Sequence, residues 1–263
     1  MRSEKLRAMF ERKELFAGTH CQIAEPIVTE IVCRQGFDFL WIDTEHSAID
    51  RKDLNTMILA AHAADVPVFV RVTYCDPNYA KPILEMDPDG IIFPNVRNVE
   101  EAKLAVAAVR YPPEGIRGYG PQRANGYGEI SNADWVGKES KKVWCIPQIE
   151  DYRAIDNLEA ILAVPGIDAL MIGPNDMSGS MGKLAQLSDP EVQRYFDMYV
   201  AKAKAAGVPV GTSFGYGGND DSQIREWIKR GVDYICVGSD MSYLASGART
   251  LAGTIRGIAK EVR

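Results

Sequence analysis

The sequence lacks the features that mark several large classes of protein. No apolar run approaches the roughly 18 residues that span a bilayer, so we expect no membrane partner. The first ten residues carry a charge every few positions without an apolar core, which predicts no secretory signal and a cytoplasmic protein. Thirty basic and 36 acidic side chains give a net charge of -6 without a basic cluster. Nucleic acid is therefore not an expected partner.

Cysteine and histidine are scarce. The five cysteines are odd in number and form no Cys-x-x-Cys pair, which predicts reduced thiols in the core. The only histidines are His20, His46 and His62, too few for a His-rich metal cage. His62 lies in a helical Ala-rich segment and is expected to pack or be solvated, whereas His20 ends an apolar run and is a pocket candidate. No Gly-x-Gly-x-x-Gly turn follows an early strand, and no Gly-Lys-Ser/Thr signature is present.

An alternation of short apolar runs and helical segments fills the chain. With 46% hydrophobic and 25% charged residues, the composition is that of a globular protein. The predicted strands are 15–21, 37–43, 67–72, 90–94, 143–149, 167–172, 208–213 and 234–237. The predicted helices are 24–34, 50–64, 77–86, 99–109, 151–163, 190–206, 220–230 and 242–263.

Eight βα units in 263 residues predict a single α/β domain, residues 1–263, folded as a (β/α)8 TIM barrel. The length is close to the roughly 250 residues typical of that fold. The segment 111–142 has no clear periodicity and is rich in Gly, Pro, Asn and Tyr. We expect it to be a functional or disordered loop.

Carboxylates follow two neighbouring predicted strands. Glu150 ends the fifth strand region and Asp176 follows the sixth, at the barrel end that carries catalytic residues. Converging carboxylates repel unless a proton or metal ion lies between them, and their oxygens suit Mg²⁺ or Mn²⁺. Alternatively, each carboxylate caps the helix that follows it. The spacing leaves both interpretations open.

His46 and Arg71 are the candidate catalytic residues at the same end. Asp43 precedes His46 by three residues and is expected to orient its imidazole as a general base; the alternative is a surface or helix-capping histidine. Arg71 ends the third strand and is suited to binding a carboxylate or stabilising an enolate. The alternative for Arg71 is a structural ion pair with Asp43 or Glu45.

Two loops are candidate substrate contacts. The segment 173–182 is rich in glycine and serine, so its backbone N–H groups are expected to form a nest for a carboxylate. The segment 119–128 is either a lid whose Arg123 reaches the site or a plain surface loop.

Four segments, 37–46, 110–118, 147–150 and 172–182, resemble the HpcH/HpaI aldolase family of metal-dependent pyruvate aldolases. The resemblance covers nearly the whole chain in order. It implies a TIM barrel and cleavage of 4-hydroxy-2-oxo acids, such as 2-keto-3-deoxy sugar acids, to pyruvate and an aldehyde through a metal-bound enolate. It also implies a homo-oligomer, a trimer or hexamer, whose final helix is exchanged between subunits.

The family's functional residues carry over to matching positions. The metal ligands for Mg²⁺, Mn²⁺ or Co²⁺ fall on Glu150 and Asp176, the base on His46 with Asp43, and the enolate-stabilising arginine on Arg71. The candidate substrate contacts are Gln148, Gly173, Pro174, Asn175, Asp176, Ser213 and Arg123.

Two departures concern the aldehyde half of the pocket. Glu85 stands where an assisting aspartate is expected after the third strand, and His20 stands where some aldolases have tryptophan. The segment 120–128 is also similar to a branch containing macrophomate synthase, in which the same scaffold decarboxylates oxaloacetate. Oxaloacetate decarboxylation is therefore the alternative activity.

Two further alternatives remain. A Schiff-base aldolase requires a lysine in the barrel, and no predicted strand clearly presents one. A non-catalytic barrel that binds a small organic acid is the alternative outside enzymology. Neither the aldehyde nor the choice of divalent ion follows from the sequence.

Overall fold

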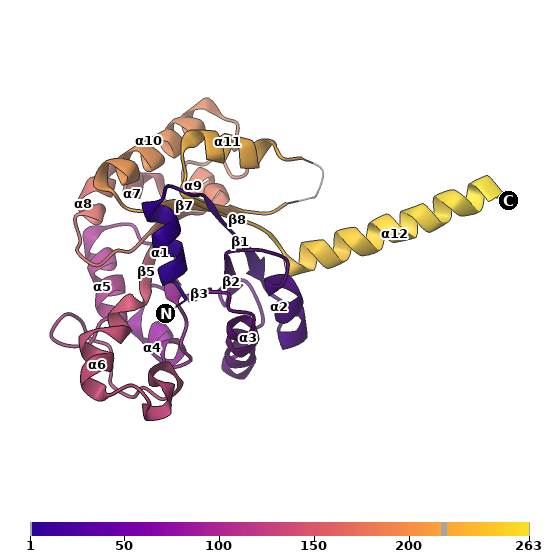
Figure 1. The fold of residues 1–263 in the computed structure, drawn as a ribbon. Coiled ribbons are helices and arrows are strands. Elements are labelled where there is room, and N and C mark those ends of the chain that lie inside the picture. Colours follow the sequence, from indigo (N-terminus) through magenta and orange to yellow (C-terminus); the bar gives the residue numbers. More distant parts are fainter. Residues whose placement is uncertain (1, 217–219, 263) are drawn as a thin grey trace.

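Eight parallel strands form a closed barrel, as the alternation predicts (Figure 1). In this computed structural model, residues 2–216 and 220–262 are described. Each strand pairs with the next in sequence and β8 pairs with β1, so the (β/α)8 prediction is confirmed. The strands are β1 (Phe16–Cys21), β2 (Phe39–Asp43), β3 (Val68–Arg71), β4 (Gly90–Phe93), β5 (Trp144–Ile149), β6 (Leu170–Ile172), β7 (Val210–Phe214) and β8 (Tyr234–Ser239).

The helices differ from the prediction in four places, one of which is a short helix at Pro174–Ser180, inside the segment 173–182. An additional helix precedes β1, the predicted helix 151–163 is broken into two at Asn157, and the segment 111–142 contains one short α-helix and two 3-10 helices, η1 (Arg123–Gly128) and η2 (Glu139–Lys142). The α-helices are α1 (Glu4–Glu11), α2 (Pro26–Cys33), α3 (Arg51–Ala63), α4 (Pro77–Leu84), α5 (Val99–Val109), α6 (Asn132–Gly137), α7 (Tyr152–Asp156), α8 (Leu158–Leu162), α9 (Pro174–Ser180), α10 (Pro190–Ala206), α11 (Ser222–Arg230) and α12 (Asp240–Val262).

The strands read as continuous apolar runs because both of their faces are covered. In β2, Leu40 and Ile42 belong to the cluster that includes residues of the surrounding helices, whereas Phe39 and Trp41 belong to the cluster inside the barrel. Side chains alternate between the two faces along a strand, so Asp43 is the next inward position after Trp41. The same alternation aims the last polar residue of several strands into the barrel mouth.

The end of the barrel at which the strands begin, called the floor below, is closed by α1 and aromatic side chains. Leu6 of α1 is buried in the inner cluster, and Met9 and Phe10 pack against it. A Cβ atom at Gly18 would lie 2.3 Å from the ring of Phe39, so glycine is required for this packing. The interior is therefore filled at the floor, and open space lies at the opposite end, the mouth.

Helix α12 runs away from the barrel (Figure 1). Its first turn is anchored, because the Asp240 carboxylate accepts hydrogen bonds from the backbone N–H groups of Gln22 and Ile23, at 3.0 and 2.8 Å. Its exposed apolar side chains are Met241, Leu244, Leu251, Ile255, Ile258 and Val262, between 49% and 79% exposed. Within the described ranges, no helix is both long and apolar enough to cross a membrane.

Candidate active site

A cavity of about 360 Å³ lies at the mouth of the barrel, where the strands end. It is lined by most of the residues that the sequence singled out: Asp43, His46, Arg71, Gln148, Gly173, Pro174, Asn175, Asp176 and Ser213. His20 also lines it, as the pocket prediction requires. No lysine lines the cavity in the part of the chain that the structure describes, so this cavity does not supply the nucleophile of a Schiff-base aldolase.

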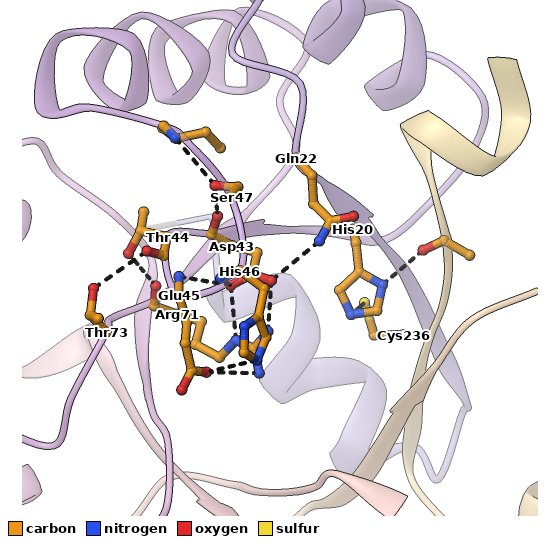
Figure 2. Close-up of polar contacts among 12 residues, drawn as sticks. His20, Gln22, Asp43, Thr44, Glu45, His46, Ser47, Arg71, Thr73 and Cys236 are labelled. Atoms are coloured by element: carbon orange, nitrogen blue, oxygen red, sulfur yellow. Dashed lines mark hydrogen bonds and ion pairs between the residues drawn. The ribbon is translucent and has the colours of Figure 1, made fainter. Parts of the chain in front are cut away.

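Arg71 and Asp43 form a buried, two-point ion pair at the bottom of this cavity (Figure 2). The two residues are register partners on β3 and β2, so their inward side chains meet directly. Arg71 Nε and Nη2 donate to the Asp43 carboxylate oxygens at 3.0 and 2.6 Å. Burial opposes ionisation of Asp43, but the hydrogen bonds and charge of Arg71 outweigh it and lower the Asp43 pKa. Both groups are therefore charged and held rigidly.

Glu45 approaches the third nitrogen of the same guanidinium. Arg71 Nη1 lies 3.0 Å from Glu45 Oε2. That buried oxygen nevertheless has no hydrogen-bond partner among the described residues, so the contact is an ion pair without an aligned N–H. Burial raises the Glu45 pKa, against the charge of Arg71. Arg71 Nη1 thus keeps N–H groups that can donate hydrogen bonds to a substrate oxygen.

The position of His46 corrects one prediction. The Asp43 carboxylate accepts hydrogen bonds from the backbone N–H groups of Glu45 and His46, at 3.0 and 3.3 Å, while its oxygens also hold Arg71. Among the described contacts, Asp43 makes none with the imidazole, whose Nε2 lies 3.9 Å from Glu45 Oε2. The His46 side chain is 65% exposed. Asp43 therefore orders the turn that carries His46, and Glu45 is the carboxylate beside the ring.

Glu150 follows β5 and turns into the barrel mouth. It is 5% exposed, and its Oε2 accepts a hydrogen bond from the backbone N–H of Asn95 at 3.0 Å. Burial raises the pKa of Glu150 to about 7, and the negative charge of Asp176 contributes to the same shift. A Cβ atom at residue 173 would lie 2.6 Å from Glu150 Oε1, so Gly173 keeps space open beside this carboxylate.

The capping alternative fails for Glu150 and holds partly for Asp176. Helix α7 is capped by the side chain of Asp151, which accepts from the N–H of Arg153. Asp176 lies in the first turn of α9, where a negative charge is favourable, but its side chain is exposed to the cavity. The predicted backbone nest at 173–182 is the first turn of this short helix, with Gly173 at its N-cap.

The donor set fits a hard divalent cation. Glu150 and Asp176 supply carboxylate oxygens, and the buried Oε1 of Gln148 has no hydrogen-bond partner in the described structure. No group of three or more His, Cys, Asp or Glu side chains with metal-binding geometry occurs within residues 2–216 and 220–262. Two protein carboxylates leave coordination positions for water and substrate, as Mg²⁺ sites commonly do.

Two predicted site residues lie elsewhere. Glu85 pairs with Arg117 at 3.2 Å, and Arg123 donates to the carbonyl of Met86 and to His62 Nδ1 at 3.0 Å. Glu85 follows α4 and precedes β4, so it lies at the floor, because α4 runs back from the mouth. Arg123 is held at this same end. Neither lines the cavity of its own chain.

His62 was expected to pack or be solvated, and the structure shows that it packs. It is buried, and its Nε2 lies 3.2 Å from the carboxylate of Asp89. It is thus a hydrogen-bonded core residue at the floor, not a solvated one.

Three cavity residues with polar side chains were missed from the sequence: Gln22, Ser239 and Ser242. Gln22 follows β1, and its amide nitrogen lies 3.4 Å from Asp43 Oδ2 (Figure 2). Strand β8 extends to Ser239, two residues beyond its predicted end, which brings Ser239 into the mouth. A polar residue at the end of a strand was the available signal for Gln22 and Ser239, whereas Ser242 lies in the first turn of α12.

Comparisons with known proteins identify the family to which the chain is similar. The family model described as HpcH/HpaI aldolase/citrate lyase matches residues 17–246. A 5-keto-4-deoxy-D-glucarate aldolase of Enterobacter sp. (strain 638) is 34% identical over 253 residues, 96% of each chain.

Solved structures show the same fold. An HpcH/HpaI aldolase/citrate lyase family protein of Burkholderia cenocepacia J2315 has a TM-score of 0.88 at 29% identity, over 97% of this chain and 99% of that one. Macrophomate synthase has a TM-score of 0.85 at 28% identity, over 100% and 91%. The predicted family resemblance and the prediction of an aldolase are confirmed.

Proposed function

The chain belongs to the HpcH/HpaI aldolase/citrate lyase family, and from this premise we propose that it is a divalent-metal-dependent aldolase. Its substrates are 4-hydroxy-2-oxo acids, such as 2-keto-3-deoxy sugar acids, which it cleaves to pyruvate and an aldehyde. The observation that carries this proposal is one cavity in which Arg71 and His46 line the same space as Asp176, while Glu150 lies next to Gly173 of that lining.

Glu150 and Asp176 would hold the cation, with Gln148 Oε1 close to the same space. A bound Mg²⁺, Mn²⁺ or Co²⁺ supplies a Lewis acid that lowers the energy of negative charge on a 2-oxo acid. Loading also gives the buried Glu150 carboxylate a positive partner, which favours its ionised form.

Arg71 binds the 2-oxo acid and stabilises the charge that develops when the C3–C4 bond breaks. Its Nε and Nη2 are fixed by Asp43, so Nη1 is presented to the cavity without reorganisation. The backbone around Asn175 and Asp176, in the first turn of α9, positions the substrate carboxylate.

His46 is the general base. Its exposed imidazole lines the cavity and accepts the proton of the C4 hydroxyl group as the C3–C4 bond breaks. The aldehyde leaves, and the same proton returns to C3 to give pyruvate. Glu45 Oε2 lies 3.9 Å from His46 Nε2, beside the ring.

Oxaloacetate decarboxylation is the second candidate. It is supported by the structural likeness to macrophomate synthase over the whole chain. It would use the same cavity, with carbon dioxide leaving in place of the aldehyde.

We also propose a trimer or hexamer with an exchanged α12. Support comes from the exposed apolar residues of α12 and from an apolar groove of about 360 Å³ lined by residues that include Val28, Ile31 and Leu244. A cytoplasmic location is supported by the free thiols of all five cysteines.

The test strips the protein with EDTA, adds one divalent ion at a time, and follows pyruvate from 4-hydroxy-2-oxo acids and, in parallel, from oxaloacetate. Metal-dependent pyruvate release from the hydroxy acids is the expected result. Release from oxaloacetate alone, above the rate with free metal, would favour the decarboxylase, and no release with any ion would contradict both.

A further inference from the structure

The cavity has two chemically different walls. One wall, from the ends of β2, β3 and β5 and the start of α9, carries Asp43, His46, Arg71 and Asp176. The other, from the ends of β1, β7 and β8, carries uncharged polar side chains. We name it the uncharged wall; its members are His20, Gln22, Ser213, Ser239 and Ser242.

His20 is a neutral ring of the uncharged wall. Its Nδ1 lies 2.7 Å from the carbonyl oxygen of Gly238, which only accepts, so Nδ1 carries the proton (Figure 2). Burial lowers the His20 pKa despite that bond, so the ring is uncharged at neutral pH, and its Nε2 accepts from the Cys236 thiol, whose Sγ lies 3.7 Å away. The ring also packs on Trp41, at 4.9 Å between centroids, which fixes its orientation.

Three groups of this wall keep hydrogen-bonding capacity, whereas the Ser242 hydroxyl accepts from the Ser239 N–H at 3.0 Å and donates to the Ser239 carbonyl at 2.7 Å. Ser239 Oγ accepts from the backbone N–H of Ser242 at 3.2 Å, and its own proton is left for another acceptor. Gln22 uses its amide nitrogen toward Asp43, which leaves its carbonyl oxygen. Ser213 is half-buried at the cavity edge of β7. A hydroxylated fragment can satisfy these groups in both directions.

In the part of the chain that the structure describes, the uncharged wall has no cation that could bind a charged group of the substrate. No Lys or Arg side chain belongs to the uncharged wall in the described residues, and Arg71 is held in the opposite wall by Asp43. A carboxylate on this wall would lose water without gaining a cation. An alkyl chain would leave the polar groups of the wall unpaired, which costs as much as a lost hydrogen bond for each group.

We propose that the uncharged wall binds the aldehyde fragment and selects uncharged, hydroxylated aldehydes. The substrates of the enzyme are then 2-keto-3-deoxy monocarboxylic sugar acids. This inference rests on the proposed aldolase function, and it separates the chain from curated relatives named for glucarate, a dicarboxylate.

Three aldehydes that differ at one end test the proposal in the direction of synthesis. Pyruvate and the metal-loaded, full-length enzyme are combined with glyceraldehyde, tartronate semialdehyde or propanal. Tartronate semialdehyde has a carboxylate where glyceraldehyde has a hydroxymethyl group, and propanal lacks both hydroxyls. We expect kcat/KM for glyceraldehyde to exceed that for each of the others by about tenfold or more. Equal or higher kcat/KM for either of the others would overturn the proposal.

A variant pair locates the selectivity. Ser213→Ala should lower kcat/KM for glyceraldehyde about tenfold more than for propanal, because only glyceraldehyde offers hydroxyl groups to the missing side chain. Ser188→Ala, exposed and outside the cavity, should leave the ratio of the two unchanged. An equal loss for both aldehydes in Ser213→Ala would remove Ser213 from recognition and overturn its assignment.

A second measurement distinguishes failure of the aldehyde subsite from failure of the proposed aldolase function. It follows, by NMR and without any aldehyde, the exchange of the methyl hydrogens of pyruvate with deuterium. Metal-dependent exchange without addition to glyceraldehyde would overturn the aldehyde subsite while supporting the enolate chemistry of the opposite wall. Absence of exchange with every ion would contradict the proposed function itself, and the subsite with it.

Discussion

The mouth and the floor of the barrel contain the same kinds of residue. Each end has a histidine, an arginine and buried carboxylates. At the floor, Asp89 accepts hydrogen bonds from the backbone N–H groups of Ser3 and Val68, at 3.1 and 3.0 Å, and pairs with His62. These bonds tie the start of the chain to the starts of two strands, so the floor cluster stabilises the fold.

Both ends contain buried polar atoms without hydrogen-bond partners among the described residues, such as Glu85 Oε2 at the floor. The mouth differs because Gln148, whose Oε1 has no such partner, lines a cavity, and the unpaired Glu45 Oε2 lies 3.0 Å from Nη1 of Arg71, which lines the same cavity. A perturbed pKa does not distinguish the two ends, since burial raises the pKa of Glu150 and of Asp87 to about 7. The difference teaches that unpaired groups around a cavity, more than residue types or titration, indicate where a ligand binds.

Removing the charge of Glu150, at the mouth, should have the largest effect on activity. Glu150→Gln should lower pyruvate release about 10³-fold, because a neutral amide is a weak ligand for a divalent ion. The melting temperature should not fall, since Gln is isosteric and still accepts from Asn95. Glu226→Gln on α11 is the matched control, exposed and distant from the cavity. Mn²⁺ binding, followed by electron paramagnetic resonance, should be lost only in Glu150→Gln, and retained binding would contradict the ligand assignment.

Arg71→Lys tests whether the reaction needs the guanidinium group or only a positive charge at this position. Lysine keeps the charge but cannot hold Asp43 at two points while presenting another donor to substrate, so kcat should fall roughly a hundredfold or more. Steady-state kinetics at saturating metal measures this change. An unchanged kcat would remove Arg71 from the reaction.

The floor should respond in stability instead of rate. Asp89→Ala leaves two backbone N–H groups and His62 without their acceptor and should cost about 3 kcal/mol of unfolding free energy. Thermal unfolding measures the loss, and kcat per folded molecule should stay within about twofold of the wild type. A fall in kcat at an unchanged melting temperature would make the two ends functionally alike.

Asp87→Asn should raise stability without changing kcat, and the size of the gain depends on pH. The folded-state pKa of Asp87 is raised to about 7, so stability is lost as the pH rises from the usual carboxyl pKa, about 4, through 7. The variant, which cannot ionise, should melt higher than the wild type at pH 8 and gain less at pH 5. The melting temperatures of the variant and the wild type at pH 5 and pH 8 test this prediction. A gain in melting temperature that is larger at pH 5 would contradict the raised pKa of Asp87.

Much of the mouth follows from the sequence because strand alternation is regular. Once Asp43 and Arg71 are recognised as strand-terminal residues, the period of two aims both into the barrel and the register brings them together. Glu150 follows β5 by the same logic.

The sequence could not predict which end of the barrel a residue of the loops and helices reaches. It also could not predict which of two possible partners a carboxylate binds. Glu85 and Arg123 look like site residues, but α4 returns the chain to the floor before either is reached. Asp43 has a histidine three residues away and an arginine on the next strand, and only the folded register shows that Arg71 takes its carboxylate. Helix α1 precedes the repeating βα pattern, and its signal, Leu6, Met9 and Phe10 at the i, i+3 and i+4 spacing of a helix face, lies outside the eight βα units.

Because α1 closes the floor, it also determines where substrates enter the enzyme and where products leave it. With Leu6 packed into the inner cluster, reactants and products share a single entrance at the mouth. The fragment held against the buried Glu150 lies deepest, so we expect the aldehyde to depart first and pyruvate last. In product-inhibition kinetics, pyruvate should accordingly compete with the hydroxy-oxo acid, whereas the aldehyde should not.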